Sequence, residues 1–327
     1  MTNQIDEKLF YAGKKHKIVC AGDCYHVKNI KPENRLIYNS LKEAINDGCR
    51  PCKHCQGKHK NEENKEERRM AIQNLEPKDH IIDWNGNQII RFGLIGDTQM
   101  GSKYTQISYL DEFYKICTLQ GINHIYHTGD ITDGLKMRPG HEYELYCTSA
   151  DELKDDVIKN YPKYNSITTH FITGNHDASL YKHIGYDIGQ SISNERPDMD
   201  YLGRDCAVVH LTPNCTLELR HPWDGTAYAI SYKPQKMIEA MESDSKPNIL
   251  AIGHYHKAEY IFHRNVHCFQ TGCFQGQTPF TRGKGISVHL GGWIITIHVD
   301  KNGYIQAISP MFIPFYSSIK DDYKNFR

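Results

Sequence analysis

The chain has 327 residues with 39 basic and 39 acidic side chains, so its formal net charge is zero. Its hydrophobic fraction of 39% and charged fraction of 24% are those of an ordinary globular protein, long enough for two domains. An uninterrupted apolar run of about 18 residues is missing, so we expect no membrane span. The polar start, Met1–Phe10, predicts no secretory signal. Eleven cysteines without such a signal predict a reducing, cytoplasmic location.

Charge is distributed unevenly along the chain. Residues 11–60 carry eleven basic and four acidic side chains, a net charge of +7, which leaves −7 for the remainder. A basic head on an acidic body is expected where one module meets a polyanion, although a solvated lysine-rich surface has the same composition. Residues 61–79 are rich in Glu, Lys and Arg and predict a charged helix or linker. We therefore predict an N-terminal module over 1–60 and a second domain over 80–327.

In the second domain, strand-like runs alternate with helical periodicity. The Asn85-Gly86 pair between two apolar runs predicts a hairpin, and helical spacing follows over 107–117 and 149–161. The predicted strands are 89–95, 122–127, 167–173, 207–211, 216–219, 249–252, 266–270, and 293–299 paired with 304–308. Alternating elements followed by a strand-rich C-terminal half predict a layered α/β sandwich.

Polar side chains follow directly after five of these strands. They are Asp97 and Gln99, then Asp130 and Asp133, then Asn175, His176 and Asp177, then His221, and finally His254 and His256. Ligands of open α/β sheets bind where the carboxyl ends of strands meet. Carboxylate and amide oxygens suit hard divalent cations, while Mn, Fe and Zn also accept imidazole. Two such cations need a shared ligand, and together they activate a water for in-line displacement at phosphorus.

These residues resemble the signature blocks of the calcineurin-like metallophosphoesterase superfamily over about residues 88–310. The resemblance implies a four-layer α/β/β/α sandwich, with two divalent ions (Mn, or alternatively Fe, Zn or Mg) and a bridging hydroxide that attacks phosphorus in line. His176 corresponds to the catalytic histidine of the family, and Asp177 would orient it. The implied metal ligands form two sets that share one carboxylate: Asp97, Gln99, Asp130 and His256 for one ion, and Asp130, Asn175, His221 and His254 for the other.

One position departs from the family pattern. Gln99 stands where the family usually has a histidine. A glutamine carbonyl is a neutral oxygen donor, better suited to Mn or Mg than to Zn. We therefore expect the first site either to favour a harder metal or to be loosely occupied, and we favour the harder metal because every other ligand is present.

The N-terminal module carries two close cysteine pairs, Cys20 with Cys24 and Cys52 with Cys55. This spacing predicts a tetrahedral Cys₄ structural zinc site, which supplies folding energy that so short a segment lacks. Residues 14–57 resemble the zinc domain of the Ada methylphosphotriester-repair protein, a small α+β fold. The resemblance implies DNA binding, and Cys20 stands at the methyl-accepting position. We expect DNA contact without methyl transfer, because related zinc domains use the fold without it.

Together these features predict a binuclear metal-dependent phosphodiesterase that cuts DNA, most similar to the double-strand-break repair exonucleases of the superfamily. Three alternatives remain open. The same centre could act on a cyclic nucleotide or a phosphomonoester; Gln99 could leave a non-catalytic DNA-binding protein; or Cys20 could repair alkylated DNA. Residues 282–285, Arg-Gly-Lys-Gly, are a candidate phosphate-contacting loop. His141 lies in a long connection that we interpret as a plain loop.

Overall fold

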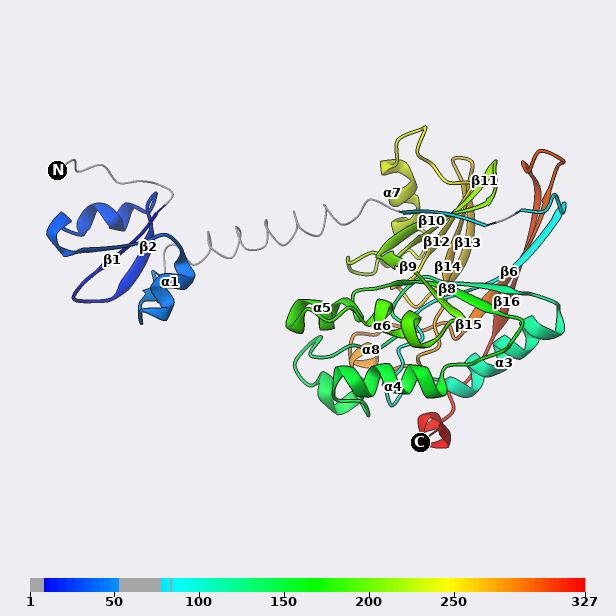
Figure 1. The fold of residues 1–327 in the computed structure, drawn as a ribbon, viewed down its shortest axis with the longest axis horizontal. Coiled ribbons are helices and arrows are strands. Elements are labelled where there is room, and N and C mark those ends of the chain that lie inside the picture. Colours follow the sequence, from blue (N-terminus) through cyan, green and yellow to red (C-terminus); the bar gives the residue numbers. More distant parts are fainter. Residues whose placement is uncertain (1–8, 53–77, 83, 327) are drawn as a thin grey trace. The chain divides into compact units, whose positions relative to one another are not determined.

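The computed structural model describes residues 9–52, 78–82 and 84–326. Its backbone contacts divide the chain into two compact units, Met1–Asn74 and Leu75–Arg327 (Figure 1). Within the described ranges, no helix is both long and apolar enough to cross a membrane.

The N-terminal unit is built on a four-stranded sheet with the order β3-β1-β2-β4. Its elements are β1 (Phe10–Gly13), β2 (Ile18–Ala21), β3 (Arg35–Tyr38), α1 (Leu41–Asn46), β4 (Arg50–Pro51) and the 3₁₀ helices Tyr25–Asn29 and Pro32–Asn34. The side chain of Ser40 accepts a hydrogen bond from the Glu43 amide and caps α1, so the start of this helix follows from its capping sequence. Two small clusters, around Val27 and around Val19, form its core.

The first sheet of the C-terminal unit has the order β13-β14-β12-β11-β10-β5. Its strands are β5 (Lys78–Ile81), β10 (Cys206–Thr212), β11 (Cys215–Arg220), β12 (Ile249–Ile252), β13 (Ala258–His263) and β14 (Val266–Thr271). The second sheet has the order β16-β15-β6-β7-β8-β9. Its strands are β6 (Ile89–Ile95), β7 (His124–His127), β8 (Thr168–Thr173), β9 (Met199–Arg204), β15 (Gly291–Val299) and β16 (Ile305–Pro314).

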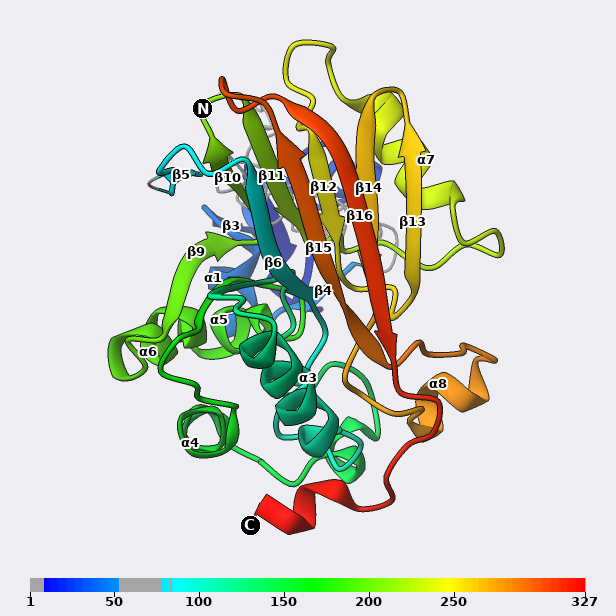
Figure 2. The ribbon, with the colours of Figure 1, turned by 90° about the vertical axis from the view of Figure 1, so that its right-hand side faces the viewer.

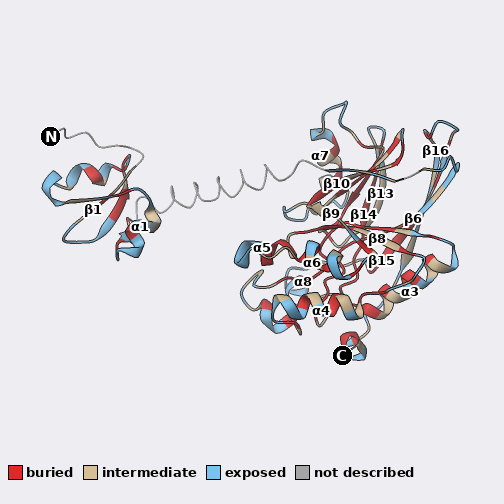
Figure 3. Ribbon diagram, in the orientation of Figure 1, coloured by how far each residue is buried: buried red, intermediate tan, exposed pale blue. Residues whose placement is uncertain are grey.

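The two sheets pack face to face, and helices cover their outer faces (Figure 2). Strands of both sheets contribute to one buried apolar cluster, which includes Leu94, Tyr126, Leu217 and Ile295. Figure 3 shows buried residues along strands of both sheets. On the second sheet lie α3 (Ile107–Leu119), α4 (Ala150–Asn160), α5 (Ala178–Ile184) and α6 (Ile188–Glu195), while α7 (Tyr232–Ala240) packs on the first. The predicted four-layer α/β/β/α sandwich is confirmed. Three further short helices complete it: α8 (Pro279–Gly283) and the 3₁₀ helices His141–Glu144 and Asp322–Phe326.

The hairpin predicted at Asn85-Gly86 is wrong. β5 pairs in parallel with β10 in the first sheet, whereas β6 pairs with β7 and β15 in the second. An Asn-Gly pair favours a tight turn locally, but the strands on either side each find longer apolar partners in different sheets. The predicted pairing of 293–299 with 304–308 is confirmed as the β15–β16 ladder.

Candidate active site

Five strand ends from both sheets position the candidate ligands. β6, β7 and β8 are parallel neighbours in the second sheet, and β11 and β12 are parallel neighbours in the first. Their carboxyl ends therefore meet at one edge of the sandwich, as expected for open α/β sheets. All seven predicted metal ligands and His176 follow these ends, and contacts between them bring segments far apart in the sequence together.

The second predicted ligand set is assembled around His221. One ligand atom each from Asp130, His221 and His254 lies within 4.8 Å of the others. His221 Nε2 is 3.0 Å from Asn175 Oδ1 and 3.3 Å from Asp130 Oδ2. His221 Nδ1 donates to the Thr128 carbonyl at 2.8 Å, which leaves the Nε2 lone pair facing two oxygen acceptors. Such a convergence of electron pairs requires a proton or a cation between them.

The first predicted set also comes together. His256 Nε2 lies 3.4 Å from Asp97 Oδ1, and Gln99 Nε2 donates to Asp130 Oδ2 at 3.0 Å. Two buried atoms in this set, Gln99 Oε1 and His256 Nδ1, have no hydrogen-bond partner among the described residues. A buried polar atom without a partner costs free energy, and a carbonyl oxygen and an imidazole nitrogen are both good ligands for Mn²⁺. These residues therefore fit a divalent cation.

The backbone at these ligands is strained. Asp97, Gln99, Asp130, His254 and His256 all have positive φ angles, between 52° and 77°. A non-glycine residue in this region costs of the order of 1 kcal/mol or more and persists only where its surroundings hold it. Backbone hydrogen bonds do so here, because the His254 amide donates to the Asp97 carboxylate at 2.9 Å and the Gln99 amide donates to the Asp130 carbonyl at 3.1 Å. Concentrated strain of this kind is typical of a functional site.

Neighbouring charges shift the pKa values of the buried groups in the site. Burial alone would raise the pKa of the Asp130 carboxyl, but the neighbouring His221 and His176 hold it well below its usual range. Burial lowers the pKa of His221, yet the Asp130 charge outweighs this and raises it to about 9. For His254 the balance is the opposite: burial and His221 lower its pKa to about 4 and outweigh the raising effect of the Asp130 and Asp97 charges, so it stays neutral and able to ligate. Its Nε2 donates to the Asp224 carbonyl at 2.6 Å, which leaves Nδ1 for a cation.

His176 is oriented by Asp133 and not, as the sequence suggested, by Asp177. His176 Nδ1 lies 2.7 Å from the Asp133 carbonyl oxygen and 2.9 Å from its Oδ1. Burial lowers the pKa of His176, but the Asp130 and Asp133 charges raise it to a net value of about 9. Because Nδ1 is engaged and the residue lines the pocket, Nε2 is the atom available to a ligand.

Asp177 instead ties two site loops together. Its carboxylate accepts hydrogen bonds from the amides of Ile131, Thr132 and Gly174 at 2.8–3.1 Å, and from the Thr132 hydroxyl. Burial, together with the Asp130 charge, raises its pKa to about 6. Asp177 therefore holds the loop after β7 against the loop after β8, and so fixes the position of Asp130 relative to His176.

Two residues of this environment had no role in the sequence-based prediction, although Asp133 was among the polar residues that follow the strands. His141, interpreted as part of a plain loop, is fully buried, with Nε2 3.4 Å from Asp133 Oδ1. Asp133, His141 and His176 form a group whose ligand atoms lie within 4.8 Å of one another. The position of Asp133, three residues after Asp130, was available as a signal. His141 offered none, because its approach depends on the path of the long connection.

Gly174 is a position at which the site has no room for a side chain. A Cβ atom there would lie 2.7 Å from His221 Nε2 and closer still to Asp130 Oδ1. We expect Gly174→Ala to lower kcat/KM about a hundredfold, because displacing reacting groups by about 1 Å has effects of that size. Gly13→Ala, which lies in the N-terminal unit and whose Cβ would meet only Ile30 at 3.9 Å, is the matched control. Steady-state kinetics on a chromogenic phosphodiester measures both; a Gly174→Ala variant as active as the control would contradict the assigned geometry.

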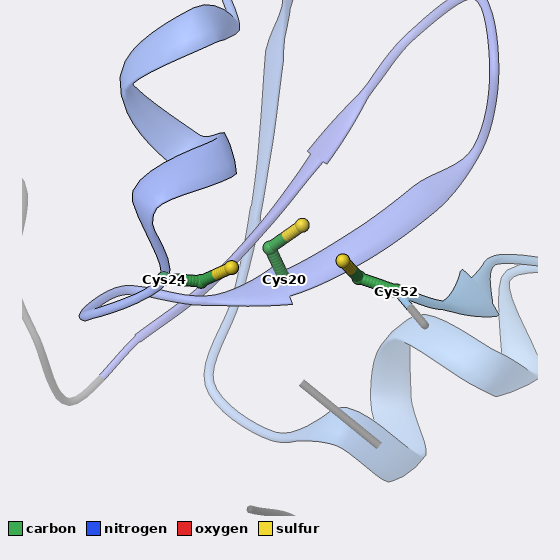
Figure 4. A group of neighbouring side chains, drawn as sticks. All are labelled: Cys20, Cys24 and Cys52. Atoms are coloured by element: carbon green, nitrogen blue, oxygen red, sulfur yellow. The ribbon is translucent and has the colours of Figure 1, made fainter. Parts of the chain in front are cut away.

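The N-terminal module contains a cluster of buried thiols. Cys20, Cys24 and Cys52 place their Sγ atoms within 4.8 Å of one another (Figure 4). Three converging sulfurs fit a tetrahedral zinc ion. The predicted fourth ligand, Cys55, lies outside the described residues. His26 was missed from the sequence: its Nδ1 lies 3.7 Å from both Cys24 Sγ and Cys52 Sγ, where a ring N–H can donate to thiolates.

The fold and these ligand groups define a metal-dependent phosphoesterase with a small zinc-binding module. The family model described as calcineurin-like phosphoesterase matches residues 90–263, and that for the metal binding domain of Ada matches residues 2–58. The chain belongs to the calcineurin-like phosphoesterase family.

Solved structures similar to the chain have low sequence identity to it. An archaeal phosphodiesterase is 10% identical, covering 68% of this chain and 100% of its own, with a TM-score of 0.40. A predicted phosphoesterase from Streptococcus pneumoniae is 11% identical, covering 69% and 98%, with a TM-score of 0.34. Vps29 from Entamoeba histolytica, complexed with zinc, is 12% identical, covering 69% and 99%, with a TM-score of 0.33. Among curated proteins, none matches the chain.

Proposed function

We propose that this protein is a DNA nuclease in which a two-metal centre hydrolyses the phosphodiester and the zinc module holds the DNA. The observation that carries the proposal is the joining, in one chain, of a phosphoesterase site to an Ada-type module whose residues 11–60 have a net charge of +7. Several of its lysines are exposed, including Lys14, Lys15, Lys28 and Lys31. Lysines of this kind bind the phosphate backbone without reading sequence.

Each side chain of the site has a definite task in this reaction. When bound, two divalent cations supply an activated water and neutralise charge on the phosphate oxygens. Asp130 would be shared by both ions; its contacts with Gln99 from one ligand set and with His221 from the other support this role. His176, held by Asp133, presents Nε2 to the pocket and can donate a proton to the leaving oxygen or stabilise charge on phosphorus.

The alternative functions can be distinguished by the substrates that the protein hydrolyses. A cyclic-nucleotide or phosphomonoester enzyme would hydrolyse small esters in Mn²⁺ and leave DNA intact. A non-catalytic DNA-binding protein would bind DNA and hydrolyse nothing. The buried Gln99 Oε1 argues against this alternative, because it has no hydrogen-bond partner in the described part of the chain and is therefore available to ligate a cation. Methyl transfer needs an accessible nucleophile, whereas Cys20 is 2% exposed.

Replacing Cys52 tests the division of labour between the two modules. We expect Cys52→Ser to release the zinc and weaken DNA cleavage at least about tenfold, since the loss of zinc unfolds small metal-stabilised modules. Hydrolysis of bis-para-nitrophenyl phosphate should persist, because that ester needs only the metal centre. The measurements are zinc content, DNA cleavage and ester hydrolysis by the full chain.

A matched control lies in the same module. Cys49 is buried beside the Tyr38 hydroxyl, with Sγ 3.5 Å from it, and it stands apart from the thiol cluster. Cys49→Ser should retain both zinc and DNA cleavage. Zinc loss from Cys52→Ser with undiminished DNA cleavage would refute a DNA-holding role for the module, while ester hydrolysis without any DNA cleavage by the natural chain would favour the small-molecule alternative.

A further inference from the structure

The active-site pocket is lined in part by residues that belong to neither predicted set of metal ligands. The cavity has a volume of about 350 Å³, which lies in the range of small-molecule sites. Its lining includes Asp130 and His176 from the metal-ligand region and also Arg138, Phe280 and Lys284. Of the candidate phosphate-contacting loop 282–285, it is therefore Lys284 that reaches the pocket.

Phe280 presents a fixed aromatic face. It lies in α8, whose start is held by a capping box between Thr278 and Thr281, and it is 40% exposed. The guanidinium carbon of Arg138 lies 4.1 Å from the centre of its ring. Glu144 holds both partners, because its carboxylate pairs with Arg138 and accepts a hydrogen bond from the Phe280 amide at 3.3 Å. The flat pair is thus organised before any ligand binds, which reduces the entropy that binding must overcome.

The charges on this wall suit an anionic ligand with a flat ring. Glu144 neutralises Arg138, which then serves mainly as a planar surface. Lys284 is exposed, and among the described residues no carboxylate pairs with its ammonium group. A planar stacking surface beside an unpaired cation and a phosphate-cleaving centre matches the chemistry of a nucleotide.

We propose that Arg138, Phe280 and Lys284 form a nucleotide subsite, in which the base next to the scissile phosphate stacks on Phe280 and Lys284 contacts an adjoining phosphate. The inference rests on the proposed phosphodiesterase activity and specifies its substrate as a nucleoside phosphate diester. Stacking on an aromatic face tolerates any base, so the subsite predicts little sequence preference. The cavity has room for about one nucleotide, so a DNA strand must present a single-stranded or frayed end.

Two chromogenic diesters with the same leaving group test the subsite. The para-nitrophenyl ester of thymidine monophosphate carries a base, while methyl para-nitrophenyl phosphate does not. We expect Phe280→Ala to lower kcat/KM for the thymidine ester at least about fivefold more than for the methyl ester, mainly through KM, as the loss of one base–aromatic stack predicts. Phe280→Trp should retain the discrimination. Phe262→Ala, which removes a 60% exposed phenylalanine outside the pocket, is the matched control.

Binding measurements give the same comparison without hydrolysis. Calorimetric titration of the Mn²⁺-loaded natural chain should show tighter binding of thymidine monophosphate than of methyl phosphate, and Phe280→Ala should remove most of the difference. Lys284→Ala should reduce the salt dependence of oligonucleotide binding by about one counterion. Equal losses on both esters, or equal binding of both phosphates by the natural chain, would overturn the subsite. Absence of hydrolysis of either ester with preserved nucleotide discrimination would instead count against the proposed function alone.

Discussion

Replacing Asp130 with asparagine is expected to reduce phosphodiester hydrolysis by about a thousandfold or more, a loss of about 4 kcal/mol in transition-state stabilisation. Asp130 is 1% exposed. Its carboxylate lies 3.3 Å from His221 Nε2 and accepts hydrogen bonds from the side-chain amide of Gln99 at 3.0 Å and from the backbone amide of His176 at 2.9 Å. An asparagine keeps the shape but removes the negative charge that two cations would share. Metal affinity should therefore fall together with kcat.

The control for this variant is a carboxylate of the same type outside the site. Asp200 lies on β9, is exposed and pairs with His170 at 2.9 Å. Asp200→Asn should retain activity, and circular dichroism with thermal unfolding should show that both variants fold. An Asp130→Asn chain that keeps more than about a tenth of the natural rate would remove the shared carboxylate from the mechanism.

His176→Ala is expected to lower kcat by about a hundredfold to ten-thousandfold, the usual contribution of a positioned proton donor. The loss should depend on the leaving group. A para-nitrophenolate departs without a proton, whereas an alkoxide needs one, so the loss should be greater for a dinucleotide than for bis-para-nitrophenyl phosphate. Metal content should stay close to that of the natural chain, since His176 belongs to neither predicted ligand set.

Two further variants make the role of His176 specific. His183 on α5 is exposed, and His183→Ala should leave the rate unchanged. Asp133→Asn should imitate part of the His176→Ala loss, because the Asp133 carboxylate and carbonyl set the orientation of the ring. Equal losses on good and poor leaving groups would assign His176 to charge stabilisation at phosphorus and not to proton donation.

The sequence predicted the site better than it predicted the contacts within it. Asp97, Asp130, Asn175, His221 and His254 could be found because each follows an apolar run at a strand end, and parallel strands end at one edge. This pattern does not depend on the direction of any side chain. It therefore identifies the site residues even where individual side-chain contacts are predicted wrongly.

Contacts that depend on loop geometry could not be predicted in this way. Asp177 is adjacent to His176 in sequence, but its carboxylate points back to the amides of the loop after β7, and Asp133 takes the place expected for it. The prediction of strand pairing at Asn85-Gly86 was wrong for a similar reason. A local turn signal was outweighed there by pairing with strands that are distant in the sequence. Glu144, which fixes Phe280 and Arg138, gave no signal in the sequence at all.

The direct measurement of the central claim is anomalous diffraction at the manganese edge from crystals of the full chain grown with Mn²⁺. We predict two peaks about 3.5–4 Å apart, the usual spacing in two-metal sites, with Asp130 between them. Gln99 and His256 should lie on one ion, and Asn175 and His221 on the other. A single peak, or peaks away from Asp130, would contradict the account.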